Sequence, residues 1–352
     1  MKNIVILSAF LSPMRSGAEA CAEEVPLALK GQHNFTIVTA RMRRDLPKKD
    51  MLKESIPVIR VGLGCTLDKW LFPLLAPRVV KRMKPDIVHA VLETFAGLAL
   101  MFCRAPKKIL TCQTTNRSFL KSMIVRSPDV VTVISQALLQ TVRGFGRDDA
   151  VLISNGIDVQ SLNSARESTK KVAGRVLFVG RLEKQKGVDT LLRAFAALTP
   201  NPSPKGRGEL LSLRIIGDGA ERQNLERLAK KLGLIDRVEF VGRVEPYLIA
   251  KEYAAAEVFC GLSRSEALGN VFLEAQAAGC AVIGTRVGGI PDIIEDNKTG
   301  LLVEPANVLE ATVALQKALS DKTLRAVLAK AGSAHAQNFS WGSIAAEYAK
   351  LY

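Results

Sequence analysis

Two glutamates stand eight residues apart in the segment SEALGNVFLEA, as Glu266 and Glu274. Residues 258–262, just before them, form an apolar run typical of a buried strand. We therefore expect Glu266 in a loop and Glu274 about one turn into a helix, which Asn270 caps and Gly279 ends. The N–H groups at the start of such a helix suit a phosphate, whereas the carboxylates repel phosphate and accept hydrogen bonds from hydroxyls. Phosphate together with several hydroxyls describes a sugar nucleotide.

The glutamate pair alone is weak evidence, because this spacing arises by chance and most glutamates are solvated surface groups. The segment AVIGTRVGGI, residues 281–290, and the following Pro291 add to it. They predict a strand, a turn with two adjacent glycines and a helix that starts at Pro291. A second strand–turn–helix unit therefore follows the first.

Other charged or glycine-containing segments follow predicted strands or precede predicted helices. In GRLEKQKG, residues 180–187, the cations Arg181 and Lys186 could neutralise a diphosphate, and a solvated charged loop is the alternative. The remaining segments have an ordinary turn or cap as their alternative. The residues in them that could border the same ligand are Gly17, Gly217, Arg243 and Val244.

Short apolar, β-branched runs alternate with helix-length segments along the chain. Runs that are apolar throughout favour parallel sheets covered on both faces, and two such sets favour two doubly wound α/β domains, which we expect to join within residues 158–174. Ligands of such sheets bind beyond the carboxyl ends of the strands. The predicted strands are residues 3–10, 34–40, 58–61, 86–91, 108–112 and 130–135, then 175–180, 211–217, 237–241, 258–262, 281–284 and 300–303.

The composition indicates a globular chain of two domains, with 352 residues of which 48% are hydrophobic. Six cysteines without a CxxC pair favour buried thiols in a reducing compartment, and three scattered histidines argue against a zinc site. No run approaches about 20 apolar residues, so we expect no spanning helix. Residues 1–7 predict a first strand rather than a signal peptide, and residues 200–208 predict a solvated loop without a catalytic role.

The net charge of +15 is uneven, because residues 1–165 hold 23 Lys and Arg against 13 Asp and Glu, a net +10. Such a balance predicts an anionic partner. Nucleic acid is the weakest candidate, since aromatics are 5% and no nucleic-acid-binding motif is present. Residues 70–84 and 117–126 mix basic and apolar side chains and predict contact with an anionic membrane surface, with core-facing helices as the alternative. The basic side chains expected at the lipid headgroups are Lys81, Arg82 and Lys121.

Five short segments stand in the order typical of a known family. They are SNGID at 154–158, VGRL with KG at 179–187, IGDG at 216–219, FVGR at 240–243 and the E-x7-E spacing. On these segments the chain resembles, nearly end to end, the retaining GT-B glycosyltransferases of family 4 (glycosyl transferases group 1). The resemblance implies an α/β fold of two facing Rossmann-like domains with a cleft between them. Residues 1–160 would bind the acceptor and residues 161–338 the nucleotide sugar, and a C-terminal helix, residues 339–352, would cross back to the first domain.

The resemblance implies three catalytic residues. Arg181 and Lys186 would hold the donor diphosphate, and Glu266 would contact hydroxyls of the transferred sugar. A nucleoside diphosphate leaves with growing negative charge, which fixed cations stabilise most in the transition state. No metal is expected, because two cations and a helix end could replace it. With retention, a donor phosphate oxygen can help to remove the acceptor's proton, so no strong protein base is required.

The resemblance also implies the donor contacts. Glu274 would accept hydrogen bonds from the ribose, and the N–H groups of Asn270 and Val271 would meet the distal phosphate. Gly17 would let a loop of the first domain approach that phosphate. The nucleobase would be bordered by Gly217, Arg243 and Val244.

Gln113 departs from the family, because many relatives carry a histidine there, near the reaction centre. Glutamine can hydrogen-bond a sugar hydroxyl but cannot act as a general base. Gln113 is a candidate for contact with the acceptor or the sugar, and so is His89, which we expect at the end of another strand. For His89 the favoured alternative is a structural histidine whose hydrogen bonds are made within the fold. The glycine-poor segment RSGAE, residues 15–19, is a second departure.

The resemblance implies transfer of a hexose-type sugar from a UDP-, GDP- or ADP-sugar to an acceptor such as lipopolysaccharide or a lipid-linked glycan. Such a role belongs to the synthesis of cell-envelope polysaccharide, in the cytoplasm or peripherally on the inner face of the membrane. Two alternatives stay open. A sugar-nucleotide epimerase of the same fold would change the sugar nucleotide without an acceptor, and a non-catalytic sugar-nucleotide-binding protein would bind the donor without turnover.

Overall fold

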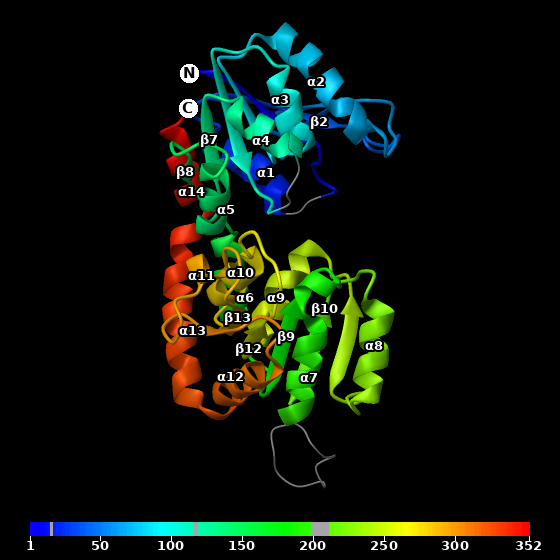
Figure 1. Cartoon of the computed structure of the whole chain (residues 1–352), viewed down its shortest axis with the longest axis vertical. Helices are drawn as coiled ribbons and strands as arrows, with labels where there is room; N and C mark the ends of the chain where they lie inside the picture. Colours follow the sequence, from blue (N-terminus) through cyan, green and yellow to red (C-terminus); the bar gives the residue numbers. More distant parts are fainter. Residues whose placement is uncertain (15–16, 116–118, 199–210) are drawn as a thin grey trace. The chain divides into compact units, whose positions relative to one another are not determined.

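The computed structural model, shown in Figure 1, describes residues 1–14, 17–115, 119–198 and 211–352. The predicted loop at 200–208 and the residues Arg15, Ser16 and Arg117 lie outside the described residues. The chain divides into unit 1, which is Met1–Gly156 with Trp341–Tyr352, and unit 2, which is Ile157–Ser340.

Unit 1 contains an eight-stranded sheet in the order β3-β4-β2-β1-β5-β6-β7-β8, and only the β3–β4 pair among its strand pairs is antiparallel. The six strands predicted for this half are present, and the first ends at Leu7 rather than at residue 10. The sequence missed β3, which is largely exposed and half charged, and β8, which has only two residues and both of them exposed. The strands are β1 (Asn3–Leu7), β2 (Asn34–Ala40), β3 (Lys49–Leu52), β4 (Ile56–Val61), β5 (Ile87–Val91), β6 (Lys107–Cys112), β7 (Val130–Val133) and β8 (Val151–Leu152).

The helices of unit 1 include the last helix of the chain. This helix, α14 (Trp341–Ala349), packs against α1 (Gly17–Leu29), and both contribute to one buried cluster with Cys21, Val25 and Tyr348. The remaining helices are α2 (Asp68–Met83), α3 (Phe95–Met101), α4 (Phe119–Arg126) and α5 (Gln136–Arg143).

Unit 2 contains a six-stranded parallel sheet in the order β11-β10-β9-β12-β13-β14. Counted along the chain this is the order 3-2-1-4-5-6 of a Rossmann sheet, which reverses between β9 and β12. A doubly wound sheet binds its ligand at that reversal, beyond the carboxyl ends of the strands. The six strands predicted for this half are present, as β9 (Arg175–Val179), β10 (Ser212–Ile216), β11 (Val238–Gly242), β12 (Val258–Cys260), β13 (Ala281–Thr285) and β14 (Leu301–Val303).

The helices of unit 2 begin with α6 (Val159–Ser168), which occupies part of the stretch where the sequence placed the domain join. None of the helices in the described part of the chain is long and apolar enough to cross a bilayer. The others are α7 (Val188–Leu198), α8 (Arg222–Lys231), α9 (Pro246–Ala255), α10 (Asn270–Ala277), α11 (Ile290–Ile293), α12 (Val308–Ser320) and α13 (Lys322–Ala336), with 3-10 turns η1 (Lys184–Lys186) and η2 (Gln337–Phe339).

The predicted cap of α10 is wrong. The residue before the helix is Gly269, whose φ of 97° is natural only for glycine, so Asn270 is the first helical residue and no side chain caps the start. The other two boundary predictions are confirmed. Gly279, with φ of 79°, follows the end of α10, and Pro291 stands in the first turn of α11.

Candidate active site

The loops after β9 and β12 meet at the point where the strand order of unit 2 reverses, since these two strands pair directly. Gly187 closes the first loop with φ of 64°, and a Cβ there would lie 1.9 Å from the carbonyl oxygen of Leu262 in the second. Gly288, after β13, approaches the second loop as closely, because its Cβ would lie 1.7 Å from the carbonyl oxygen of Glu266. Glycine is therefore required where these backbones touch.

Lys186 and Glu266 form an ion pair across this junction. The distance from Lys186 Nζ to Glu266 Oε2 is 2.6 Å, although the residues are 80 positions apart in sequence. Their side chains are 17% and 15% exposed, and the hydroxyl of Ser263 donates to the same carboxylate oxygen at 3.2 Å. The structure thus brings together a cation and a carboxylate that the sequence assigned separately to the same ligand.

Arg181 lies in the same loop as Lys186 but is far more exposed. Its guanidinium donates to Glu183 at 2.6 Å, and the side chain is 71% exposed. An exposed pair of this kind contributes little to stability, so a ligand anion can replace Glu183 at small cost.

Glu274 lies on the fifth residue of α10, about one turn in as predicted. The hydroxyl of Tyr253, on α9, donates to Glu274 Oε2 at 2.8 Å. Burial raises the pKa of Tyr253 well above its ordinary value, and the neighbouring charge of Glu274 raises it further, so the phenol stays a donor. The sequence missed Tyr253, because nothing near Glu274 in the chain points to a tyrosine 21 residues upstream. Asn270 and Val271 form the first turn of the same helix, whose leading N–H groups lack intrahelical acceptors.

The residues assigned to the nucleobase lie at the ends of β10 and β11. Gly217 has φ of 130°, and a Cβ there would lie 1.9 Å from the carbonyl oxygen of Gly180, at the end of β9. Its N–H donates to the carbonyl oxygen of Gly242 at 2.8 Å. Arg243, which is exposed, and Val244, which is half-buried, follow directly. Three loops at the carboxyl edge of the sheet are thus adjacent.

In unit 1, the side-chain amide of Gln113 forms hydrogen bonds with the side-chain amide of Asn155. The amide of Gln113 donates to Asn155 Oδ1 at 3.2 Å, and the amide of Asn155 donates back to Gln113 Oε1 at 2.8 Å. The two residues are 6% and 2% exposed. Asn155 belongs to the SNGID segment, so this reciprocal pair ties the end of β6 to the segment that closes unit 1. Gly17, the remaining residue assigned to the donor, is the first residue of α1.

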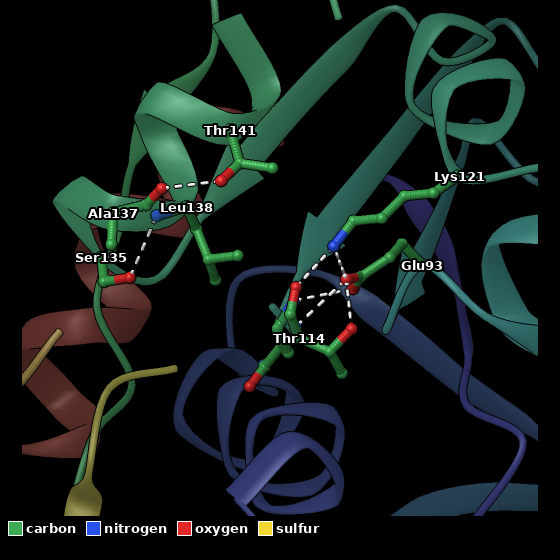
Figure 2. Close-up of polar contacts among 8 residues, drawn as sticks. Glu93, Thr114, Lys121, Ser135, Ala137, Leu138 and Thr141 are labelled. Carbon is green, nitrogen blue, oxygen red and sulfur yellow. Dashed lines mark hydrogen bonds and ion pairs between the residues drawn. The ribbon is translucent and has the colours of Figure 1, made fainter. Parts of the chain in front are cut away.

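A buried ion pair, missed by the sequence, lies beside Gln113. Figure 2 shows Lys121 of α4 pointing at Glu93, which follows β5, with 2.8 Å between Nζ and Oε1 and side chains only 4% and 2% exposed. The carboxylate of Glu93 also accepts the N–H of Gln113 at 2.8 Å, and the N–H and hydroxyl of Thr114 at 3.1 and 2.7 Å. Leu92 before it has φ of 82°, a strained backbone for leucine.

The prediction that Lys121 faces lipid headgroups is therefore wrong. The basic and apolar pattern of its helix suits an exposed face as well as a buried one, and the buried carboxylate of Glu93 decides between them. An unpaired buried carboxylate is costly, so Glu93 draws the ammonium inward.

His89 lies inside β5 rather than at a strand end, which corrects the prediction from sequence. One ring nitrogen bonds the hydroxyl of Tyr352 and the other that of Thr111, each at 2.7 Å. Burial lowers the pKa of His89 to about 3, so the ring is neutral. These contacts favour the structural alternative over a contact with substrate.

Two family models match the chain almost end to end. Residues 15–161 match the model described as Glycosyltransferase Family 4, and residues 161–335 match the one described as glycosyl transferases group 1. The chain belongs to glycosyltransferase family 4.

Curated relatives of this family 4 member include D-inositol 3-phosphate glycosyltransferases. That of Corynebacterium urealyticum is 32% identical over 67% of this chain, and the second such protein of Catenulispora acidiphila is 33% identical over 68%. The match spans 59% of the length of each relative.

Solved structures show that this family 4 member has the GT-B fold. Sucrose-phosphate synthase from Thermosynechococcus elongatus superposes with a TM-score of 0.86 at 24% identity, covering 100% of this chain and 98% of that one. Anabaena HepE, in complex with UDP and glucose, gives 0.77 at 20% identity, with 100% and 99% covered. WaaG, a glycosyltransferase of lipopolysaccharide biosynthesis, gives 0.71 at 18% identity, with 99% of each chain covered.

Proposed function

We propose that the protein is a retaining glycosyltransferase that moves a hexose-type sugar from a nucleoside-diphosphate-sugar to an acceptor. The observation that carries this proposal is the pair of Lys186 and Glu266 at the strand-order reversal of unit 2, where doubly wound sheets bind their ligands. One residue of the pair suits a phosphate and the other suits a sugar hydroxyl.

Donor binding would exchange the partners of this pair. The diphosphate would take the ammonium of Lys186, and Glu266 would then accept hydrogen bonds from the sugar. As the bond to the anomeric carbon breaks, negative charge grows on the diphosphate, and Lys186 with Arg181 would stabilise it. Retention follows if the acceptor enters on the side from which the diphosphate leaves, with a phosphate oxygen accepting its proton.

Glu274 would hold the nucleoside end of the donor. Its carboxylate is oriented by Tyr253 and lies one turn from the N-terminus of α10, whose N–H groups suit the distal phosphate. Gly217, Arg243 and Val244 would border the base at the neighbouring strand ends.

The direct test is a thermal-shift panel with UDP-, GDP- and ADP-glucose, followed by product analysis. HepE has been solved with UDP and glucose, and starch synthase IV with ADP and acarbose, which supports the inclusion of the UDP- and ADP-sugars. A ligand at about 100 times its Kd adds about 2.7 kcal/mol, which raises the Tm by a few degrees. Stabilisation by none of the three would count against the proposal, and conversion of the sugar nucleotide without an acceptor would favour an epimerase.

A lipid-linked glycan or lipopolysaccharide is the acceptor we propose, reached from the cytoplasmic face of a membrane. The support lies on α2, whose exposed stripe is apolar at one end and basic at the other. Trp70 and Leu74 are 64% and 57% exposed, and one to two turns further Arg78, Lys81 and Arg82 are exposed too. Each such cation near an anionic surface adds about 1 kcal/mol.

Vesicle sedimentation tests the membrane contact. We expect more protein to sediment with anionic than with neutral vesicles at low salt, and charge reversal at Lys81 and Arg82 to abolish the difference. Lys121 is unsuitable for this test because it is buried. Equal binding to both vesicle types would rule out the α2 stripe as an electrostatic anchor.

A second candidate is a protein that binds a sugar nucleotide without turnover. The observation that favours it is Gln113, whose amide is bound to Asn155 and cannot accept a proton in catalysis. Donor binding without release of a nucleoside diphosphate, with any of a panel of glycan acceptors, would support this candidate over the transferase.

A further inference from the structure

Arg264 lies in the loop after β12 and joins it to the loop after β9. Its backbone N–H donates to the carbonyl oxygen of Gln185 at 2.7 Å, and its guanidinium donates to the carbonyl oxygen of Lys184. The same guanidinium donates to Asp189 Oδ2 at 2.8 Å and to the hydroxyl of Thr190 at 3.2 Å, both in the first turn of α7.

These contacts bracket Lys186 on both sides. Residues 184–185 precede it and residues 189–190 follow it, so Arg264 bonds backbone carbonyls before the cation and side chains after it. Arg264 also stands two residues before Glu266, the partner of Lys186. A single arginine therefore links the backbone positions from which the two charged side chains extend.

The contacts of Arg264 contribute little to the stability of the fold. The side chains of Arg264 and Asp189 are 34% and 41% exposed, and ion pairs at such exposure contribute about 0–1 kcal/mol. What the contacts supply is geometry. A lysine has four rotatable bonds, so the place of its ammonium depends on the backbone from which it starts. Arg264 restrains the segment that carries Lys186 from both ends, through the carbonyls of residues 184 and 185 and the side chains of residues 189 and 190.

We propose that Arg264 is a positioning residue for sugar transfer, which holds the turn of Lys186 in register with the loop of Glu266. The proposal rests on the proposed function. Arg264 acts through Lys186 and Glu266, and its own guanidinium is engaged by Lys184 and Asp189.

The proposal is tested by the turnover of UDP-glucose in Arg264→Leu and Arg264→Lys, measured as the UDP released. If the thermal-shift panel selects another base, GDP- or ADP-glucose replaces UDP-glucose. We expect Arg264→Leu to lower kcat by up to about 10²-fold, as a displacement on the order of 1 Å does, with a smaller change in KM. Arg264→Lys recovers part of the loss, because an ammonium keeps the charge but not the fork of donors.

Arg325 is the matched control. Like Arg264 it donates to backbone carbonyls, those of Ala318 and Leu319, and to a carboxylate, Glu257 at 3.0 Å, but Glu257 precedes β12, at the opposite end of that strand. We expect Arg325→Leu to lower the Tm at least as much as Arg264→Leu while kcat stays at the wild-type value.

Amide hydrogen exchange in residues 183–188 provides a readout that needs no substrate. We expect faster exchange there in Arg264→Leu and Asp189→Asn and no change in Arg325→Leu. Wild-type exchange and kcat in Arg264→Leu would overturn the proposal. If the wild-type protein turns over none of the three donors, the proposed function fails, and the exchange data still decide whether Arg264 holds the turn.

Discussion

The carboxyl ends of the two sheets each carry a lysine–glutamate pair, and the two pairs differ in burial and in the number of hydrogen bonds that the carboxylate accepts. In unit 1 the pair of Glu93 and Lys121 is at least 96% buried, and the carboxylate also accepts two backbone N–H groups and a hydroxyl. In unit 2 the pair of Lys186 and Glu266 is 15–17% exposed, and apart from the pair itself a serine hydroxyl donates to its carboxylate.

The difference indicates which pair can be exchanged for a ligand. A carboxylate that already accepts hydrogen bonds from backbone N–H groups has no free acceptor site for a substrate. Moving it away would leave those N–H groups unpaired. A partly exposed pair loses less, because a diphosphate and sugar hydroxyls can replace each partner. Position at a strand end and opposite charge are thus insufficient to identify a site; burial and the number of filled hydrogen-bond positions separate the two.

The largest effect is expected when the pair of unit 1 is broken. Lys121→Met leaves the carboxylate of Glu93 buried without its cation, which we expect to lower the free energy of unfolding by about 3–5 kcal/mol, measured by denaturant titration. Lys350→Met, which removes an exposed pair with Glu347 in the same unit, should cost less than about 1 kcal/mol. Equal losses in the two variants would contradict a structural role for the buried pair.

The pair of unit 2 should show the reverse behaviour. We expect Lys186→Ala to lower kcat by about 10²–10³-fold, because the charge it supplies matters most in the transition state, with little change in Tm. Arg181→Ala should act in the same direction, and Lys298→Ala, an exposed pair with Glu295, should be neutral. Full turnover in an Arg181→Ala/Lys186→Ala double variant would remove the assignment of both cations.

Acid should weaken unit 1 through His89. Its pKa is about 3 in the fold and near 6.5 when unfolded, so below about pH 6.5 the unfolded chain binds a proton that the folded chain does not. Stability is therefore complete above that pH and falls toward pH 3, on the order of 1 kcal/mol per pH unit. Denaturant titrations of the wild type and His89→Gln between pH 7 and 4 measure it, and parallel slopes would contradict a buried neutral ring.

A smaller effect is expected at the donor end of unit 2. Tyr253→Phe removes the hydroxyl that orients Glu274 and should raise the donor KM about tenfold, the equivalent of about 1.4 kcal/mol, with kcat less affected. The ring of Phe259 also packs against this tyrosine, tilted at 53° to it, and Phe259→Leu serves as a packing control. A loss of kcat with unchanged KM would place Glu274 in the chemical step instead.

No effect is expected from chelation. Among the described residues, no group of three or more His, Cys, Asp or Glu side chains is placed to hold a metal ion. Arg181 and Lys186 already supply two positive charges to the proposed diphosphate site, so we expect activity to persist in EDTA. Loss of activity in EDTA and its recovery with magnesium or manganese would show that Lys186 and Arg181 are not the main stabilisers of the leaving group.

The sequence alone determined the elements and their order. Strands buried on both faces are apolar throughout, so runs such as 175–180 and 281–284 could be recognised as strands. The predicted site segments follow such runs and so lie at the carboxyl ends of the strands, where doubly wound sheets bind their ligands. The edge strand β3 was missed because it is exposed and has no such run, and the edge strand β8 was missed because it is only two residues long. The sequence also did not predict the start of α10, where Gly269 with a positive φ precedes the helix instead of the expected Asn270 cap.

The tertiary structure decided the partners. Lys121 stands in a basic and apolar helix that suits a membrane surface in sequence, and a carboxylate 28 residues upstream turned it inward. Tyr253 and Arg264 carry no local signal, because each acts on a loop or helix that is distant in the chain. Helical and strand periodicity indicate which face of an element is apolar. They do not indicate which charged group or hydroxyl of a neighbouring element that face will contact, because this contact forms only when the elements pack together.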